Sequence, residues 1–201
     1  MSDGLPTTSD PRATRMHLGI AEHGKVLALQ GQHAEALACY REAIRLAVSK
    51  GDPEVFFRHY TTCVLESLER MGSYAEIIEF CDRAVAHYDQ HPPPHAVALW
   101  DLAAIHMRRG LVLIKAGEAI EARAALAKAT ATASRAGGTL PLATAVAGWL
   151  ARGFAIDTAR VTQEQERHDY YSVRPDTVRP ALAIRPTDTA GAPGRLRQDG
   201  R

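Results

Sequence analysis

A pattern of small and apolar residues occurs three times in this chain with the same internal spacing. The copy with the clearest pattern consists of Gly110, Leu113, Gly117, Ala122, Leu126 and Ala129. The spacing recurs at Gly24, Leu27, Gly31, Ala36, Tyr40 and Ala43, and in a weaker form at Leu65, Leu68, Gly72, Ile77, Cys81 and Ala84. The first and last members of each copy are 19 positions apart. Fixed spacing within copies, with variable spacing between them, is typical of a repeat protein.

Each copy predicts two helices separated by a turn glycine. On both sides of Gly31, apolar and small residues recur every three or four positions, as they do along one face of a helix. Glycine tolerates the left-handed conformation that ends many helices, so Gly31 is expected to separate two antiparallel helices. Gly24 and Ala36 are small, which lets the two helices approach closely. The three copies predict helical hairpins at about residues 15–50, 54–90 and 95–136.

The pattern resembles the tetratricopeptide repeat (TPR), whose signature places an aromatic residue, then Leu-Gly, then Tyr on a first helix, and Ala followed by Phe on a second. The second copy departs most from this signature, with Thr61, Leu65 and Cys81 at the positions of an aromatic, a small and an aromatic residue. The resemblance covers about residues 15–135. It implies an all-α fold in which three helical hairpins form a right-handed superhelical stack.

The distances between the copies predict long helices. Gly31 and Gly72 are 41 residues apart, and Gly72 and Gly117 are 45 residues apart, whereas the usual TPR period is 34 residues. The two excesses correspond to about two and three helical turns. We therefore expect long helices near residues 54–71 and 95–116, as in the long-repeat branch of the family.

The residues outside the hairpins predict a cap and two tails. After Gly137-Gly138, a helical apolar period that includes Leu142, Val146 and Trp149 predicts one capping helix over residues 140–168. The repeat domain would then cover residues 11–168. Residues 1–10 are polar and are expected to be disordered.

Residues 169–201 contain three Arg-Pro pairs and several glycines, and they predict a disordered tail. The candidate contact residues in this tail are Arg174, Arg179 and Arg185. Three alternatives remain open for the tail: it solubilises the protein, it contacts a partner, or it folds back into the protein's own groove beside Glu66 and Glu69.

The resemblance also implies a concave groove lined by the first helix of each hairpin. Its lining would include Ala21, Lys25, Leu29, Thr62, Glu66, Arg70, Met107, Leu111 and Ile114. Such a mixed, partly apolar groove suits a peptide or an amphipathic helix of another protein. We therefore expect a non-enzymatic adaptor or regulatory scaffold. The alternative is a chaperone of a secreted or assembling client, similar to the three-repeat chaperones of bacterial secretion systems.

Composition argues against several classes of partner. The formal net charge is +1 at pH 7, and no basic run marks a nucleic-acid surface, so we expect no nucleic-acid partner. The longest apolar run, residues 140–151, is too short to cross a bilayer, and we expect no membrane partner. The N-terminus has no apolar stretch typical of a secretory signal, and the cysteines form no C-x-x-C pair. These features favour the cytoplasm.

The sequence also contains few residues that indicate chemistry. It has none of the common hydrolase, nucleotide-binding or metalloprotease motifs, so we expect no enzyme activity and no catalytic residue. His87, His91 and His95 follow one another at intervals of four residues, but three prolines separate the last two, which favours a polar loop over a metal site. No metal or cofactor is expected. The three cysteines are expected to fill the core.

Overall fold

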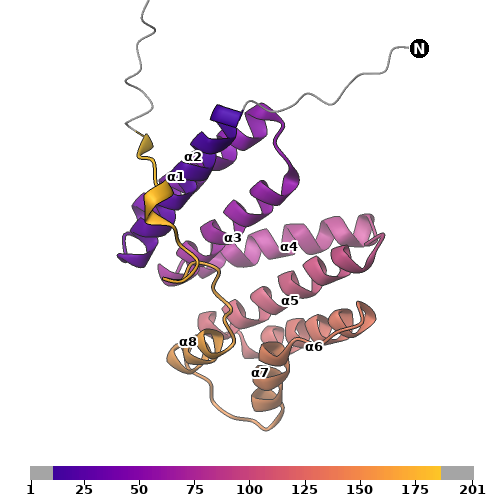
Figure 1. Cartoon of the computed structure of the whole chain (residues 1–201). Helices are drawn as coiled ribbons and strands as arrows, with labels where there is room; N and C mark the ends of the chain where they lie inside the picture. Colours follow the sequence, from indigo (N-terminus) through magenta and orange to yellow (C-terminus); the bar gives the residue numbers. More distant parts are fainter. Residues whose placement is uncertain (1–10, 187–201) are drawn as a thin grey trace, which may run out of the picture. The chain divides into compact units, whose positions relative to one another are not determined.

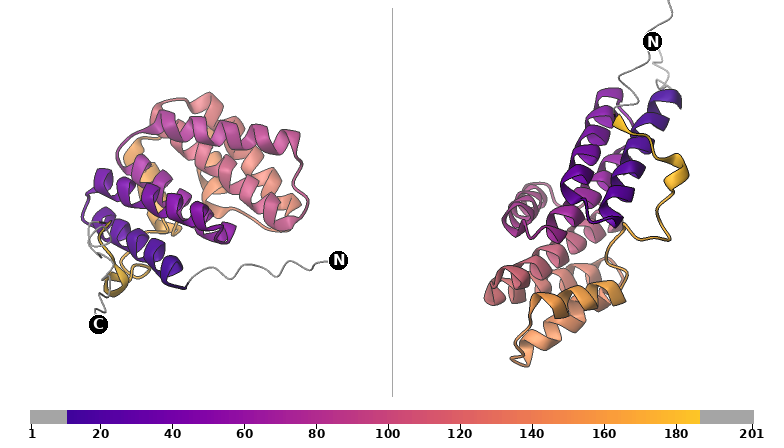
Figure 2. Two further views of the ribbon diagram at one scale, coloured as in Figure 1. Left: turned by 90° about the horizontal axis from the view of Figure 1, so that it is seen from above. Right: turned by 90° about the vertical axis from the view of Figure 1, so that its left-hand side faces the viewer.

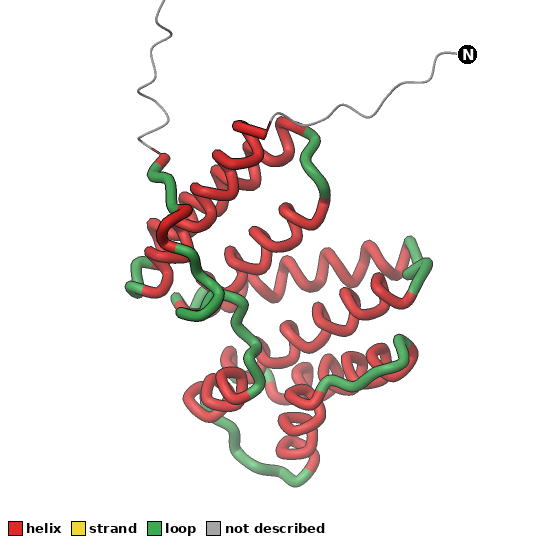
Figure 3. The backbone as a smooth tube through the Cα atoms, in the orientation of Figure 1, coloured by secondary structure: helices red, strands yellow, loops and turns green. Residues whose placement is uncertain are grey.

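The computed structural model describes residues 11–186, and within this range the chain is all-α (Figure 1 and Figure 3). Its elements are α1 (Pro11–Leu29), α2 (His33–Lys50), α3 (Glu54–Arg70), α4 (Tyr74–Gln90), α5 (Ala96–Ala116), α6 (Ala119–Arg135), α7 (Pro141–Ala151), α8 (Thr158–Arg167) and the short 3-10 helix η1 (Pro180–Leu182). The described residues contain no strand. The all-α class predicted from the sequence is confirmed. The expected disorder of residues 1–10 and 187–201 lies outside the described residues.

The bounds of the first six helices agree with the three predicted hairpins to within a few residues. The turn glycines Gly31, Gly72 and Gly117 have φ angles of 78°, 78° and 90°. Residues with a Cβ atom rarely adopt this left-handed conformation, so a glycine at each turn allows the chain to leave one helix and begin the next. The long helices expected near residues 54–71 and 95–116 are α3 and α5.

The chain divides into two compact units, where the sequence predicted one continuous domain over residues 11–168. The first unit contains residues 11–67 and 173–186 of the described range, and the second is Leu68–Ser172. The division lies inside α3, in the second copy of the pattern. Leu65 occupies the position of Gly24 and Gly110 there, so this copy lacks the feature that permits close helix packing.

The first unit is built on α1, α2 and α3, with residues 173–186 along α1 (Figure 2). The core of this unit contains Ile20, Ala21, Cys39, Ala43, Ala47 and Tyr60, and a neighbouring cluster contains Ala36, Tyr40 and Cys63. Gly24 packs against the ring of Tyr40, and a Cβ atom at Gly24 would lie 2.7 Å from that ring. The helices α1 and α2 approach closely because Gly24 has no side chain.

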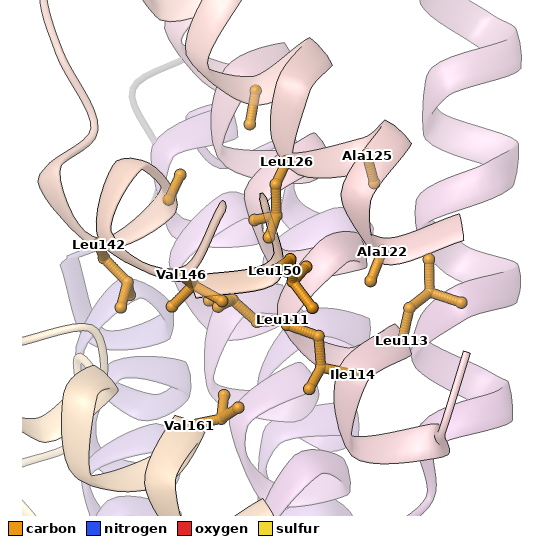
Figure 4. Close-up of a cluster of buried hydrophobic side chains, with 12 residues drawn as sticks. Leu111, Leu113, Ile114, Ala122, Ala125, Leu126, Leu142, Val146, Leu150 and Val161 are labelled. Carbon is orange, nitrogen blue, oxygen red and sulfur yellow. The ribbon is translucent and has the colours of Figure 1, made fainter. Parts of the chain in front are cut away.

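The second unit repeats this packing. A Cβ atom at Gly110 in α5 would lie 2.7 Å from the side chain of Leu126 in α6. Gly110 and Leu126 hold the same places in the third copy as Gly24 and Tyr40 hold in the first. The small residue therefore meets the large residue of its own copy. Around this contact, side chains from α5, α6, α7 and α8 form one apolar cluster (Figure 4).

The predicted single capping helix over residues 140–168 is wrong. The structure has two helices, α7 and α8, separated by a loop in which Gly153 has a φ of 75°. The backbone N–H of Arg160 donates to Oδ1 of Asp157 at 2.7 Å, which caps the first turn of α8. The left-handed glycine ends the helical path, and the Asp157 side chain begins a new one.

The predicted disorder of the tail does not hold for residues 169–186. Val173, Val178 and Ile184 give part of this stretch apolar contacts with the first unit, and backbone N–H groups of the stretch donate to that unit. The arginines and prolines suggested too little apolar surface for folding. The spaced valines and isoleucine supply enough surface for this stretch to pack.

We predict that Gly110→Ala destabilises the protein. The new methyl group overlaps the Leu126 side chain, and overpacking of this kind costs about 1–3 kcal/mol. The gain in helix propensity offsets at most about 1 kcal/mol of this cost. Thermal unfolding should therefore show a lower midpoint than the wild type.

Gly148→Ala in α7 is the matched control, because a Cβ atom there meets only the end of the Arg152 side chain, at 3.8 Å. This variant should unfold at the wild-type midpoint or slightly above it. If Gly110→Ala behaves like Gly148→Ala, the close contact between α5 and α6 is not present in solution.

Candidate functional site

In the first unit, the predicted groove residues are mostly covered. Ala21 is buried in the core, and Lys25 is buried and donates from Nζ to Oε1 of Glu22 at 2.7 Å. Thr62 is half-buried, Glu66 is buried, and only Leu29, at 43%, is an exposed large side chain. Most of these positions therefore do not form an open groove.

In the second unit, two predicted groove residues belong to the core. Leu111 and Ile114 are buried in the cluster that includes Val161 of α8 (Figure 4). The interpretation that they line an open groove is wrong, because apolar side chains of α7 and α8 cover them. Met107 is half-buried and packs against the same cluster. Arg70 is exposed, with its guanidinium 3.9 Å from the centre of the Tyr171 ring.

Residues 173–186, called here the return segment, are held on the first unit by backbone groups. The N–H of Val173 donates to Oε2 of Glu66 at 3.1 Å, and the N–H of Arg179 donates to Oε2 of Glu22 at 2.9 Å. The N–H of Ile184 donates to the carbonyl oxygen of Gly19 at 2.9 Å. Two carboxylates and one carbonyl group of α1 and α3 thus accept hydrogen bonds from a segment that is mostly irregular (Figure 3).

Apolar side chains of the return segment pack at three points. Val173 packs against the cluster of Ala36, Tyr40 and Cys63. Val178 is 7% exposed. Ile184 lies directly over Gly19 of α1, where a Cβ atom would overlap the Ile184 side chain. A side chain at position 19 would therefore close the place that Ile184 occupies.

The three arginines proposed as tail contacts have a smaller part in this packing. Arg174 pairs with Asp176 inside the segment, with Nη2 and Oδ2 3.2 Å apart. Arg179 and Arg185 are exposed, and Arg179 contributes its backbone N–H. Contacts of the arginine side chains with a partner stay a prediction.

A buried carboxylate, Glu69, organises one end of the second unit. Nζ of Lys115 and Nε2 of Gln165 donate to its Oε1 at 2.8 and 2.7 Å. The phenol of Tyr170 donates to Oε2 at 3.1 Å, and Nη1 of Arg108 lies 3.5 Å from the same oxygen. These groups come from α5, α8 and the residues directly after α8. Glu69 therefore fastens α8 and the following residues to the end of α3 and to α5.

The pKa shifts at this centre follow from burial and charge. Burial alone would raise the pKa of Glu69, but the charges of Lys115 and Arg108 outweigh it and the pKa is lowered. Burial lowers the pKa of Lys115, and the Glu69 carboxylate opposes that shift only in part. Burial also raises the pKa values of Tyr170 and Tyr171, which keeps both phenols protonated as donors. Lys115, Gln165 and Tyr170 donate hydrogen bonds to the carboxylate and Arg108 adds a nearby positive charge, which is the arrangement of a structural tie.

A second buried polar group lies in the first unit, around His17. Its Nδ1 lies 2.6 Å from the hydroxyl oxygen of Tyr60, and its Nε2 lies 3.2 Å from Oδ2 of Asp52. Burial lowers the pKa of His17, against the opposing effect of Asp52. The order of Asp, His and Tyr is one that proton relays use, but His17 and Asp52 have no exposed side-chain surface. This group ties α1 to the start of α3 and is closed to a substrate.

The histidines considered as metal ligands have other contacts. Nδ1 of His95 accepts from the N–H of Ala98 and caps α5, and Nδ1 of His91 lies 3.2 Å from the carbonyl oxygen of His87. No group of three His, Cys, Asp or Glu side chains within residues 11–186 is placed to hold a metal ion. The cysteines Cys39, Cys63 and Cys81 are buried, as the sequence suggested. Burial raises the pKa of Cys81 to about 11.

A surface hollow of about 610 Å³ lies beside α7 and α8. Its charged lining consists of Arg160 and Arg167 with Asp157 and Glu164. The two arginines and two carboxylates leave no net charge to select a charged ligand. The guanidinium of Arg160 in α8 lies over the ring of Trp149 in α7, 4.4 Å from the ring centre, and so joins the two helices.

No family model, no curated protein and no solved structure matches this chain. Among the helices of residues 11–186, none has both the length and the apolar character needed to cross a membrane. With no related protein to compare, the function is inferred from the contacts that the return segment makes with α1 and α3.

We predict that Glu69→Gln strongly destabilises the second unit. The substitution leaves the Lys115 ammonium buried without its carboxylate, and breaking a buried pair in this way costs about 3–5 kcal/mol. Denaturant unfolding measures the loss. Glu79→Gln is the control, since Glu79 and Arg83 form an exposed pair, and such pairs contribute about 0–1 kcal/mol. Equal losses in the two variants would show that Glu69 is not buried with Lys115.

The pH dependence of unfolding gives a separate prediction. Because the pKa of Glu69 is lowered from 4.5 in the folded chain, its stabilising contribution is fully present above about pH 4.5 and is lost as the pH falls through the lowered pKa. The wild type should lose stability as the pH falls below 4.5, and Glu69→Gln should lose less over the same range. Parallel pH profiles for the two proteins would contradict the lowered pKa of Glu69.

Proposed function

We propose that this chain is a non-enzymatic protein-interaction module of the helical-repeat class, similar to TPR proteins. It acts as an adaptor or regulatory scaffold that binds a segment of a partner protein. The single observation that carries the proposal is the surface of α1 and α3 on which the return segment lies. This surface, called here the seat, consists of Gly19, Glu22, Glu66 and the cluster around Tyr40. There, the helical surface binds a stretch of chain through its backbone N–H groups.

The seat has the two parts that a peptide site needs. Hydrogen bonds to the main chain give affinity for any sequence, and pockets for side chains give selectivity. Here Glu22, Glu66 and the carbonyl group of Gly19 accept from the main chain. The bare α-carbon of Gly19 and the cluster around Tyr40 receive side chains. A partner segment could use the same groups.

The likeness to TPR proteins is supported by the packing inside each unit. Gly24 against Tyr40 and Gly110 against Leu126 are equivalent contacts of two copies of one pattern. A superhelical arrangement of the hairpins is proposed by analogy with that family, as is a place in the cytoplasm. The partner is proposed to be another protein and not a nucleic acid or a membrane.

We predict that the seat binds peptides once the return segment is released. Ile184→Asp places a charge over the apolar seat at Gly19 and should release the end of the segment, while α1 to α3 stay unchanged. A random library of displayed 15-residue peptides is selected against this full-length variant. Calorimetry should then give dissociation constants in the range of about 1–100 μM for selected peptides, as expected for a small peptide interface.

A substitution at Gly19 tests whether the selected peptides bind at the seat. Adding Gly19→Ala to the Ile184→Asp variant should weaken the selected peptides about tenfold, because the methyl group fills the space that receives a side chain. Gly148→Ala in the same background should have no effect. If no peptide is selected, or if every selected peptide binds equally well with Ala at position 19, the seat is not a binding site for partners.

A further inference from the structure

We infer that the return segment is an internal mimic of the partner. The partner binds with an irregular, proline-containing segment that carries three apolar anchors at intervals of five and six residues, and it competes with the return segment for the same seat. The anchors of the mimic are Val173, Val178 and Ile184. This inference rests on the proposed function and deepens it.

The three anchors are tied to the backbone hydrogen bonds in a fixed register. The N–H groups that donate to the helices belong to Val173, Arg179 and Ile184, so each bond lies at an anchor or one residue after it. Between the anchors, most side chains are exposed, and Leu182 is 54% exposed. The seat therefore contacts three positions of the segment and leaves the others exposed. We call the required spacing of the three anchors the spacing rule for the partner.

The spacing excludes a helical partner segment from this seat. Residues five and six apart do not share one face of a helix, whose face repeats every three or four residues. Pro175 and Pro180 also exclude a continuous helix from the segment, which forms a turn at residues 175–177 and the 3-10 helix Pro180–Leu182 within irregular chain. Of the peptide and the amphipathic helix expected from the sequence, the geometry favours the peptide.

The charges favour a basic partner segment. The return segment contains Arg174, Arg179 and Arg185 against one carboxylate, Asp176, which gives a net charge of +2. The two side chains that accept its N–H groups are the carboxylates Glu22 and Glu66. Lys25 pairs with Glu22 and offsets part of this negative charge. The charge that remains favours a basic partner segment and increases its rate of association.

The contacts of the return segment are also of a kind that a partner can replace. The segment has exposed residues throughout its length, and the 3-10 helix Pro180–Leu182 has no buried residue. A competing segment with the same anchors and N–H groups can make every contact with the seat that the return segment makes. Because the return segment is part of the same chain, it reduces the apparent affinity for the partner by the fraction of molecules in which the seat is filled.

The test uses a synthetic peptide with the sequence of residues 172–186, labelled with fluorescein, and the full-length chain. Fluorescence anisotropy measures its binding to the wild type, to Ile184→Asp and to Leu182→Asp. If the seat is filled in more than about nine of ten wild-type molecules, Ile184→Asp should bind the peptide at least about tenfold more tightly. Leu182→Asp should bind like the wild type, because Leu182 is exposed.

A second release variant guards against a folding defect of Ile184→Asp. Arg179→Pro removes the N–H that donates to Glu22, and the φ of proline, about −65°, departs from the φ of −118° that Arg179 has, so both effects loosen the segment. It should also raise the affinity for the peptide. Circular dichroism checks that both variants keep the helical content of the wild type.

Altered peptides test the spacing rule. A peptide with all three anchors changed to Asp, and a peptide with one residue removed between the second and third anchors, should each bind Ile184→Asp at least about tenfold more weakly than the native sequence. Equal binding by these peptides, or equal binding of the native peptide to the wild type and both release variants, overturns the inference.

The inference and the proposed function can fail separately. If the native peptide fails to bind while library-selected peptides bind at Gly19, the return segment is not a mimic of the partner and the proposed function stands. If neither class of peptide binds, both fail.

Discussion

The packing of this protein depends on α-carbons that carry no side chain. Gly24 receives the ring of Tyr40, and Gly110 receives the side chain of Leu126. Each contact sets how closely the two helices of a hairpin approach, and the buried clusters of each unit form around that spacing. Gly19 applies the same device on the surface of α1, where it receives Ile184 of the return segment. Helix pairing and binding of the return segment thus both depend on a glycine that leaves room for a neighbouring side chain.

A closed set of charges completes the second unit. Glu69 lies in the interior with Lys115 and Arg108, and burying such charges is tolerable only when each carboxylate oxygen meets donors. Gln165 and Tyr170 supply those donors. Since Tyr170 follows α8 directly, the interaction fixes the path of the chain just before the return segment begins. The buried charges therefore support the unit that precedes the segment.

The hairpins could be predicted from the sequence because their signals are local. The turn glycines and the three-to-four-residue apolar period lie within each copy, so the bounds of α1 to α6 follow closely.

The division inside α3 and the contacts of Glu69 depend on residues far apart in the chain, for which a single sequence gives no spacing signal. Leu111 was assigned to a groove for the same reason: the side chains that bury it belong to helices that follow later in the chain. Gly153 and Asp157, a left-handed glycine followed by a helix cap, are the local signal that separates α7 from α8. The valines and isoleucine of the return segment were visible, but their places on α1 and α3 were not.

The most direct measurement is hydrogen–deuterium exchange of the full-length protein with and without a competing peptide that has the same anchors but different residues between them. In the free protein, the amides of Val173, Arg179 and Ile184 should exchange slowly, since each donates to α1 or α3. With saturating peptide, these three amides should exchange rapidly while those of α1 and α3 stay protected. Slow exchange of the three amides at saturating peptide, or rapid exchange in the free protein, would contradict a return segment that occupies the partner's seat.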